Sequence, residues 1–270
     1  MRLAVLADIH GNLPAFEAAV EHADRQGVDG LVILGDLMVG APDSAACWRL
    51  ARSLDCPILR GNNDRYVAHY DTPAAPPLWR SEQFGPLRAA VAQFTPEERR
   101  NIGDLPLVLQ LPEAPDILFV HASKRSDHDT VSAHTPTAQL RQMFDAVSAP
   151  LIVRAHNHLG QLRLWDERKI ITCGSVGLAL DGHPTAQYLQ LDRHRDEWRI
   201  RHQSVPYDLE ATLRRFRTTG YLDAAGPMGR LYLREVATAS LQLVPFLRHY
   251  RNWASSLSLD EAVERFLNMY

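Results

Sequence analysis

Lysine is almost absent from the sequence. Lys124 and Lys169 are the only lysines among 29 basic residues, and arginine supplies the remainder. The arginines are interspersed with aspartate and glutamate, and the formal net charge is only −3. The sequence therefore carries no general attraction for nucleic acid or for an anionic membrane surface. If the protein binds phosphate groups, it has to do so at a local site.

Cysteines and long apolar runs are also scarce. Cys47, Cys56 and Cys173 are an odd number without CxxC spacing, which indicates neither a disulfide framework nor a thiolate metal site. No apolar run approaches the ~18 residues that a membrane-spanning helix needs. Residues 1–7 lead straight into a short apolar strand and lack the long apolar region of a signal peptide. We therefore expect a cytoplasmic protein that does not associate with membranes.

Short apolar segments alternate with helical patterns in the first part of the chain. Strands are predicted at residues 3–7, 28–34 and 57–59, and helices are predicted to follow Asn12, as an N-cap, and Asp43. Strands that alternate with helices indicate βαβ units and a mostly parallel sheet. A chain of 270 residues can bury one large core, whereas two full domains would be a tight fit.

The pattern changes in the middle of the chain. Residues 66–106 contain several prolines and a helix start at residues 95–98, and they are predicted to form an inserted cap or a plain surface excursion. Closely spaced strands follow, which favours hairpins and a more antiparallel sheet. They are predicted at residues 107–111, 117–120, 151–154, 161–165, 169–173, 186–192 and 198–203. Together, these elements predict an α/β fold over residues 1–206, in which two β layers of mixed sheets are flanked by helices.

Residues 207–270 are predicted to form a helical C-terminal extension, with later helices at 233–254 and 259–268. This segment contains no recognisable chemistry. Its apolar positions are expected to pack against the body or against a partner, so a homo-oligomer through these helices is one expectation. The positions concerned are Leu241, Val244, Leu247 and Tyr250.

Five short segments place metal-ligating residue types directly after predicted strands. They are Asp8-Ile9-His10, Gly35-Asp36, Gly61-Asn62-Asn63-Asp64, His121 and His156-Asn157-His158. Open α/β sheets bind ligands beyond the carboxyl ends of their strands, so these segments can converge on one crevice. Ligands at positions i and i+2 point to the same side of an extended strand exit, and glycines at 35 and 61 allow sharp turns.

Each segment alone has a simpler interpretation. A single histidine after a strand is typical of a capped or surface residue, and Gly-Asp or Asn-Asn-Asp is typical of a turn or an N-cap. Five such segments in one order seldom arise from turn chemistry alone. We therefore interpret them together as one metal site.

In order and content, these segments resemble the calcineurin-like metallophosphoesterases, especially small bacterial phosphodiesterase-like members. The resemblance covers roughly residues 1–206 and includes Gly174-Ser175-Val176-Gly177 and Val205-Pro206-Tyr207. It implies the metallophosphoesterase fold and a centre of two divalent metal ions with Asp36 as the bridging ligand. By this resemblance, one ion would be held by Asp8, His10, Asp36 and His158, and the other by Asp36, Asn62, His121 and His156.

This mixture of nitrogen and oxygen ligands suits manganese, our first choice, but also iron, zinc, cobalt or nickel. Two carboxylates against two divalent cations leave about two positive charges, which can activate a bridging water and attract phosphate. The predicted function is a dinuclear phosphoesterase in which a metal-bound hydroxide attacks a small phosphodiester or nucleotide. The alternatives are a phosphomonoesterase or protein-phosphatase-like enzyme, and a catalytically weak interaction scaffold on the same fold.

Asn63 is a departure from the family pattern. Many members have a histidine there that is thought to protonate the leaving group, whereas an amide can donate a hydrogen bond but cannot supply a proton near pH 7. Either another residue supplies the proton or the leaving group needs none, which favours diesters. His69, His128 and His134 are candidate donors, although the pattern favours a solvated loop histidine at each of these positions.

Other candidate residues lie near the predicted metal ligands. Asn63 and Asp64 are assigned a transition-state or supporting role. Lys124 and Arg125 could meet the substrate phosphate, or could belong to a solvated charged loop. The full set of predicted substrate contacts is Asn12, Arg65, Lys124 and Arg125.

Overall fold

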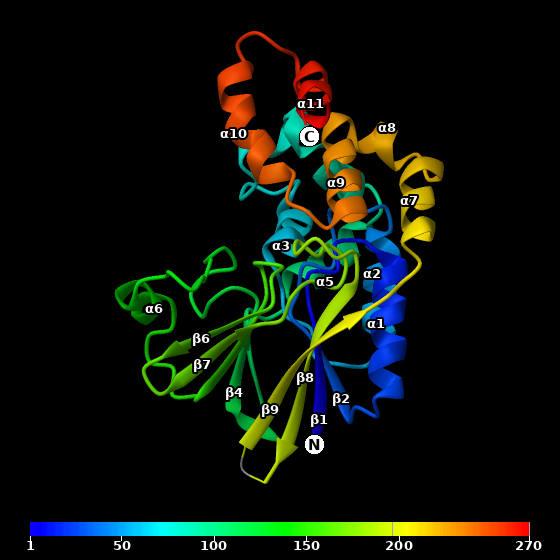
Figure 1. Ribbon diagram of the computed structural model, residues 1–270. Helices are drawn as coiled ribbons and strands as arrows, with labels where there is room; N and C mark the ends of the chain where they lie inside the picture. Colours follow the sequence, from blue (N-terminus) through cyan, green and yellow to red (C-terminus); the bar gives the residue numbers. More distant parts are fainter. Residues whose placement is uncertain (196, 270) are drawn as a thin grey trace.

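The computed structural model describes residues 1–195 and 197–269, and it contains two mixed β-sheets with helices outside them (Figure 1). One sheet runs in the spatial order β2 (Gly30–Ile33), β1 (Arg2–Leu6), β8 (Ala186–His194) and β9 (Glu197–Val205). The other runs in the order β3 (Val108–Leu111), β4 (Ala114–Val120), β5 (Leu151–Arg154), β7 (Arg168–Thr172) and β6 (Gln161–Trp165). The predicted architecture of two mixed sheets flanked by helices is confirmed.

Strand pairing follows the expected division only in part, because the second sheet also contains parallel pairs. β1 pairs in parallel with β2, and β5 pairs in parallel with both β4 and β7. The closely spaced pairs β6–β7 and β8–β9 are antiparallel hairpins. The predicted strand at residues 57–59 is wrong in extent, because this segment forms only a single parallel bridge between Ile33 and Ile58.

The core lies between the sheets and on both outer faces, as the first strand illustrates. Leu3 and Val5 of β1 pack into the cluster between the two sheets, whereas Ala4 and Leu6 point to the helical side. All four side chains are buried, because a strand covered on both faces is apolar at every position.

Helices cover the outer face of each sheet. α1 (Leu13–Arg25) and α2 (Ser44–Ser53) follow β1 and β2 as predicted, and Asn12 caps α1 by accepting from the amide of Ala15. α6 (Thr137–Met143) packs on the outer face of the second sheet through Leu140. These layers fix the direction of the strands and therefore the place where their loops meet.

The segment predicted as a cap is mostly helical. It contains α3 (Asn62–His69), the 3-10 turns η1 (Pro77–Arg80) and η2 (Glu82–Phe84), α4 (Gly85–Val91) and α5 (Pro96–Gly103). The predicted start of α5 is confirmed, because Thr95 and Glu98 form a reciprocal capping box. α3 was not predicted from the sequence, and its start at Asn62 brings a helix N-terminus to the candidate ligands.

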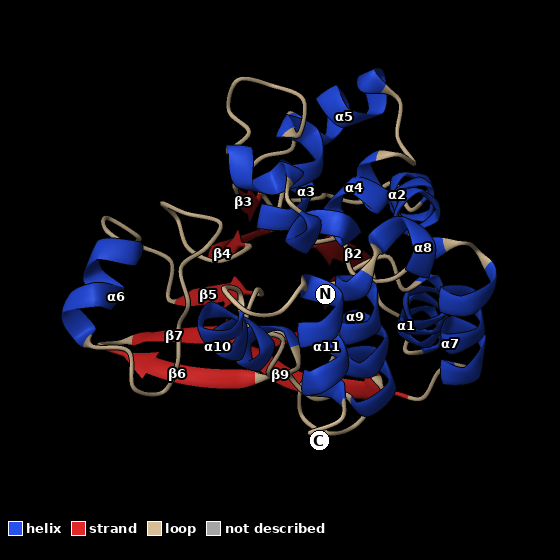
Figure 2. Cartoon of the chain, turned by 90° about the horizontal axis from the view of Figure 1, so that it is seen from above, coloured by secondary structure: helices blue, strands red, loops and turns tan. Residues whose placement is uncertain are grey.

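Within the described residues, five helices follow the last strand. They are α7 (Leu209–Thr218), α8 (Tyr221–Ala225), α9 (Pro227–Thr238), α10 (Leu243–Trp253) and α11 (Leu259–Leu267). The single helix predicted at 233–254 is wrong, because Ala239 adopts a left-handed conformation with φ of 47° and ends α9. Viewed from above, α9, α10 and α11 lie over the strands (Figure 2). None of the helices in the described part of the chain is both long and apolar enough to cross a bilayer.

Candidate metal centre

Side chains that follow strands of both sheets gather in two groups. Asp8 and His10 follow β1, Asp36 follows β2, His121 follows β4, and residues 156–158 follow β5. β1 and β2 are parallel, as are β4 and β5, so each pair brings its loops to the same edge of its sheet. Within each group, the ligand atoms lie within 4.8 Å of one another.

Three of the histidines have an orientation fixed by the backbone. His10, His121 and His158 each place Nδ1 at hydrogen-bond distance from a carbonyl oxygen, so Nδ1 carries the proton and Nε2 keeps a lone pair. The carbonyls belong to Val39, Leu34 and Leu178, at 2.7, 2.7 and 2.8 Å respectively. All three Nε2 atoms are therefore available as ligands.

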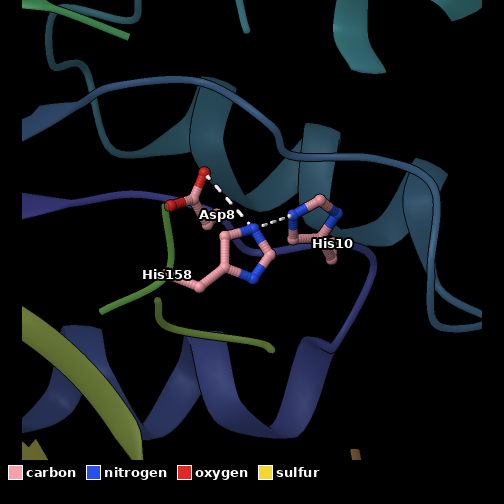
Figure 3. Close-up of side chains that lie close together, drawn as sticks. All are labelled: Asp8, His10 and His158. Carbon is pink, nitrogen blue, oxygen red and sulfur yellow. Dashed lines mark hydrogen bonds and ion pairs between the residues drawn. The ribbon is translucent and has the colours of Figure 1, made fainter. Parts of the chain in front are cut away.

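The first group consists of Asp8, His10 and His158. His158 Nε2 lies 3.0 Å from His10 Nε2 and 4.0 Å from Asp8 Oδ1, and its ring faces both residues (Figure 3). Two ring nitrogens that both present lone pairs repel each other unless a cation lies between them. This donor set of two imidazoles and one carboxylate fits a divalent metal ion.

The second group consists of Asp36, His121 and His156, with Asn62 beside them. As placed, Asn62 Oδ1 lies 3.3 Å from His121 Nε2 and also faces His156 Nδ1, another acceptor. Hydrogen bonding within the protein alone would favour the reversed amide, whose nitrogen would donate to both rings. If a metal ion binds here, Asn62 Oδ1 has to face that ion. The two ring nitrogens would then bind the same ion and would no longer simply repel the oxygen.

Asp36, a member of the second group, also lies close to the first group. Its Oδ2 atom is 3.7 Å from His10 Nε2 and 3.6 Å from His121 Nε2, so one oxygen is equally close to a histidine of each group. Burial alone would raise the pKa of Asp36, but His121, His10 and the amide of Asn63 lower it to about 2. A carboxylate held ionised in this position can bridge two cations.

Three of the four histidines at the centre, His121, His156 and His158, are kept in the neutral form that metal ligation requires. Burial, reinforced by the neighbouring His121, lowers the pKa of His156 to about 3. Burial also lowers the pKa of His121, and burial together with His10 lowers the pKa of His158 well below its usual value. At neutral pH, these rings therefore offer lone pairs without first having to lose a proton.

The backbone at these ligands is unusual. Five of the seven predicted metal ligands have positive φ angles between 51° and 71°, a region that residues other than glycine seldom adopt. They are Asp8, His10, Asp36, His156 and His158. The expectation of extended strand exits was therefore wrong, although the paired side chains do reach the site. Such strain persists only where surrounding contacts enforce it, and it concentrates at functional sites.

Two glycines allow the loops to approach closely, as expected. A Cβ atom at Gly61 would lie 2.2 Å from Asp36 Oδ1, and one at Gly35 would lie 2.3 Å from the amide nitrogen of Gly61. Gly35 also has a φ of 90°. A larger residue at either position would displace the Asp36 carboxylate or the loop that carries it.

The N-terminal part of the chain matches a known protein family. A family model described as calcineurin-like phosphoesterase matches residues 1–160. The chain belongs to this family. Membership supports a metal-dependent phosphoesterase, and the two Asp/His groups provide the donors for the dinuclear centre that the family uses.

Relatives of known structure share the fold over most of their length. A metallophosphoesterase from Sphaerobacter thermophilus is 23% identical with a TM-score of 0.68, and the match covers 88% of this chain and 99% of that chain. Hypothetical protein PH1004 from Pyrococcus horikoshii OT3 is 19% identical with a TM-score of 0.66, covering 84% and 97% respectively. By sequence, uncharacterized protein MJ0912 of Methanocaldococcus jannaschii is 24% identical over 229 residues, covering 77% of this chain and 88% of that protein.

Asn63 and Asp64, next to the predicted ligand Asn62 in the sequence, both form hydrogen bonds with Asp36. Asn63 donates to the Asp36 carboxylate through its backbone amide at 2.8 Å and its side-chain amide at 2.7 Å. Asp64 is fully buried and accepts from the amides of Asp36, Leu37 and Gly61 at 2.8 to 2.9 Å. Asp64 therefore holds two ligand loops together, and the geometry does not favour a transition-state role for it.

The predicted substrate contacts are mostly engaged elsewhere. Asn12 is fully buried, and its side chain bonds Gly177 and Thr212, so it is not available to a substrate. Lys124 donates to a backbone carbonyl, and Arg125 pairs with Asp129. These three residues were predicted from their nearness in sequence to ligands, but their side chains are used to stabilise the surrounding loops.

His128 is the candidate proton donor that lies beside the centre. Its ring centroid is 6.4 Å from that of His156, and its Nε2 atom contacts Arg65 at 2.6 Å and the Tyr66 hydroxyl at 3.2 Å. Arg65, predicted to bind substrate, also forms a bidentate pair with Asp127. None of the three candidates, His69, His128 and His134, is among the described residues that line the two cavities at the centre.

Two cavities open onto the centre. The cap-side cavity has a volume of about 300 Å³ and the histidine-side cavity about 470 Å³. The cap-side cavity is lined by Val39, Phe84, Leu87, Met228, Leu243 and Leu247, among others. The histidine-side cavity is lined by His10, His156, His158, Leu159, Leu180 and Leu241, among others. Asn62, Asn63, Tyr232 and Leu243 line both.

The contribution of α9 to this site was not predicted from the sequence. Tyr232 lines both cavities, and Glu235 lines the histidine-side cavity. These two residues are three positions apart and share one face of a helix, which the apolar pattern alone assigns to packing. The one available signal was a glutamate on an otherwise buried face, because such a residue requires a polar partner.

Proposed function

We propose that the protein is a phosphodiesterase that hydrolyses small phosphodiesters at a two-metal centre, with manganese as the first metal to test. The observation that carries this proposal is the position of Asp36 Oδ2, which is equally close to a histidine of each ligand group. Bound there, two divalent ions would lower the pKa of a coordinated water and neutralise phosphate charge. Asp8, His10 and His158 would hold one ion, and Asn62, His121 and His156 the other.

The surrounding residues favour a diester over a monoester. None of the described residues that line either cavity is lysine or arginine, and Glu235 adds potential negative charge. At pH 7, a phosphate monoester carries close to two negative charges, whereas a diester carries one. About two positive charges remain at the centre and the attacking hydroxide would offset one of them, so the singly charged ester is the better match.

Asn63 supports the same choice. Both of its nitrogen donors are directed at Asp36, so the side chain positions the bridging carboxylate and has no proton to give to a leaving group. A diester with an acidic leaving group, such as 4-nitrophenolate, does not need that proton.

The test compares bis(4-nitrophenyl) phosphate with 4-nitrophenyl phosphate in manganese-reconstituted protein. We expect kcat/KM for the diester to be at least about tenfold higher. We expect Asn63→His to raise activity on diesters with poorer leaving groups by about tenfold or more, since general acids contribute about 100-fold or more. Asn101→His, on the exposed surface of α5, is the matched control. A faster monoester, or an Asn63→His variant identical to the control, would contradict the proposal.

A further inference from the structure

The cap-side cavity is built from parts of the chain that are remote in sequence. Phe84 and Leu87 come from the cap, Met228 from α9, and Leu243 and Leu247 from α10. Contacts elsewhere also join the cap to the C-terminal helices, since Ala89 of α4 belongs to the same apolar cluster as Phe216 and Tyr221. The cavity therefore forms where the cap and the C-terminal helices meet beside the centre.

The lining of this cavity is uncharged. Among the described residues that line it, none carries a charged side chain, and its polar members are neutral amides and tyrosines. A charged group that enters it would lose part of its hydration without gaining an ionic partner, so the desolvation cost disfavours a second phosphate there. An uncharged aromatic or aliphatic group would gain from the burial of its apolar surface.

The size of the cavity also limits its occupant. A closed apolar cavity of roughly 150 Å³ accommodates a benzene ring. At about 300 Å³, this cavity has room for a substituted aromatic ring or a short aliphatic chain. A protein surface or a long polymer would not fit within it.

The cavity opens onto the metal ligands. Asn62 and Asn63, which contact the second ligand group and Asp36, form part of its wall. The histidine-side cavity shares both residues and extends in another direction past His10 and His158. A phosphorus atom at the ligand groups would therefore have two separate spaces for its substituents.

We propose that the cap-side cavity is a specificity subsite for one uncharged, apolar ester arm of a phosphodiester, while the other arm lies in the histidine-side cavity. This inference rests on the proposed function, because it places the phosphate at the two ligand groups. It makes Leu247 and Gln83, which line the cavity from α10 and from the cap, determinants of the arm that is accepted.

The test measures binding of diphenyl phosphate and dimethyl phosphate to the full-length, manganese-loaded protein by calorimetry. We expect the wild-type protein to bind diphenyl phosphate at least about tenfold more tightly, because its rings bury apolar surface. Leu247→Trp fills the cavity from α10 and should reduce this preference by about fivefold or more. Gln83→Trp fills it from the cap and should do the same, so the test does not depend on one variant folding.

Arg248→Trp is the matched control, because Arg248 is exposed on the same helix and lines neither cavity. It should retain the wild-type preference. Equal affinity for the two phosphates, or an unchanged preference in both folded cavity variants, would overturn the subsite. Hydrolysis of bis(4-nitrophenyl) phosphate by the same preparation is recorded separately, so that lack of turnover counts against the proposed function and the binding comparison still decides the subsite.

Discussion

Asp64 shows how a buried carboxylate can support a metal centre without belonging to either ligand group. Its two oxygens accept three backbone amides from the loops at residues 35–37 and 61–64. Burial and the nearby Asp36 raise the pKa of Asp64 to about 7. The residue is therefore a positioning residue for Asp36, and its contribution is made through the backbone.

The expected effect of Asp64→Asn follows from these contacts. The amide nitrogen would face a backbone donor and leave it without an acceptor, which costs about 1–3 kcal/mol in the free energy of unfolding. Loosening the Asp36 loop should also weaken manganese binding by about tenfold or more, the range seen when residues that orient ligands are removed. Thermal unfolding and metal titration measure the two effects.

The matched control is Asp104→Asn, because Asp104 is exposed at the end of α5. It should leave both quantities unchanged. If Asp64 instead acted on the transition state, its variant would lose kcat while keeping normal stability and metal affinity.

The ligand types could be predicted from the sequence, but their conformations could not. Asp8, His10, Asp36, His121 and His156 were recognised from their positions after strands. The positive φ angles at most of them are imposed by tertiary contacts, such as the hydrogen bond from the Ser175 hydroxyl to the carbonyl of Asp8 at 2.7 Å. Local propensity favours extended or turn conformations there, and it is overridden by the assembled loops.

At the scale of secondary-structure elements, the joint between α9 and α10 is organised by one glutamate. Glu235 is 2% exposed, and its Oε1 atom accepts from the amides of Gln242 and Leu243 at 2.9 and 3.3 Å. These bonds satisfy the first turn of α10 after Ala239 ends the preceding helix. The periodic apolar pattern continues through this joint, which is why the sequence predicted one helix.

Glu235 also predicts a dependence of stability on pH. Burial raises the pKa of Glu235 to about 7, despite the two amides that favour the ionised form. Because the pKa is higher in the folded chain than in the unfolded chain, the stabilising effect is complete below about pH 4.5 and is lost as the pH rises through about 7. Glu235→Gln, which can still accept both amides, should remove this dependence.

The measurement is the unfolding free energy of wild-type and Glu235→Gln protein between pH 5 and 8.5. We expect the variant to be more stable than the wild type by roughly 1–3 kcal/mol above pH 8, with a smaller difference near pH 5. Glu264→Gln, exposed on α11, should follow the wild type throughout. A Glu235→Gln variant that loses stability equally at both ends of the range would show that the carboxylate is ionised in the folded protein.

For the whole molecule, the sequence was sufficient to predict the two sheets and the edge at which their loops meet. Parallel pairing of β1 with β2 follows from apolar strands separated by a helical pattern, whereas the parallel pairing of β5 with β4 and β7 was not expected, because closely spaced strands favour hairpins. The placement of α9 and α10 over this edge was not predictable, because their amphipathic faces fit a partner chain as well as the body. The proposed division at residue 206 and the proposed homo-oligomer through these helices stay predictions.

The arrangement of the whole molecule gives each segment a distinct part. The sandwich carries the ligand groups, whereas the cap and the C-terminal helices form the walls of the cap-side cavity. Fully buried Arg154 links the loops that follow β4 and β5. It donates to the carbonyls of Ala122 and Asp129 and to the side chain of Asn157. Asn62 and Asn63 line the cavity and also lie at the ligand groups, whereas the walls from α4, α9 and α10 contain none of the predicted metal ligands.

The central claim is that two ligand groups share Asp36, and counting bound manganese tests it most directly. We predict two manganese ions per wild-type chain after reconstitution, measured by elemental analysis and calorimetry. His158→Ala and His121→Ala each remove a ligand from one group and should retain one ion, whereas Asp36→Ala should weaken both sites. A wild-type chain that binds fewer than two ions, or a His158→Ala variant that still binds two with unchanged affinity, would contradict the account.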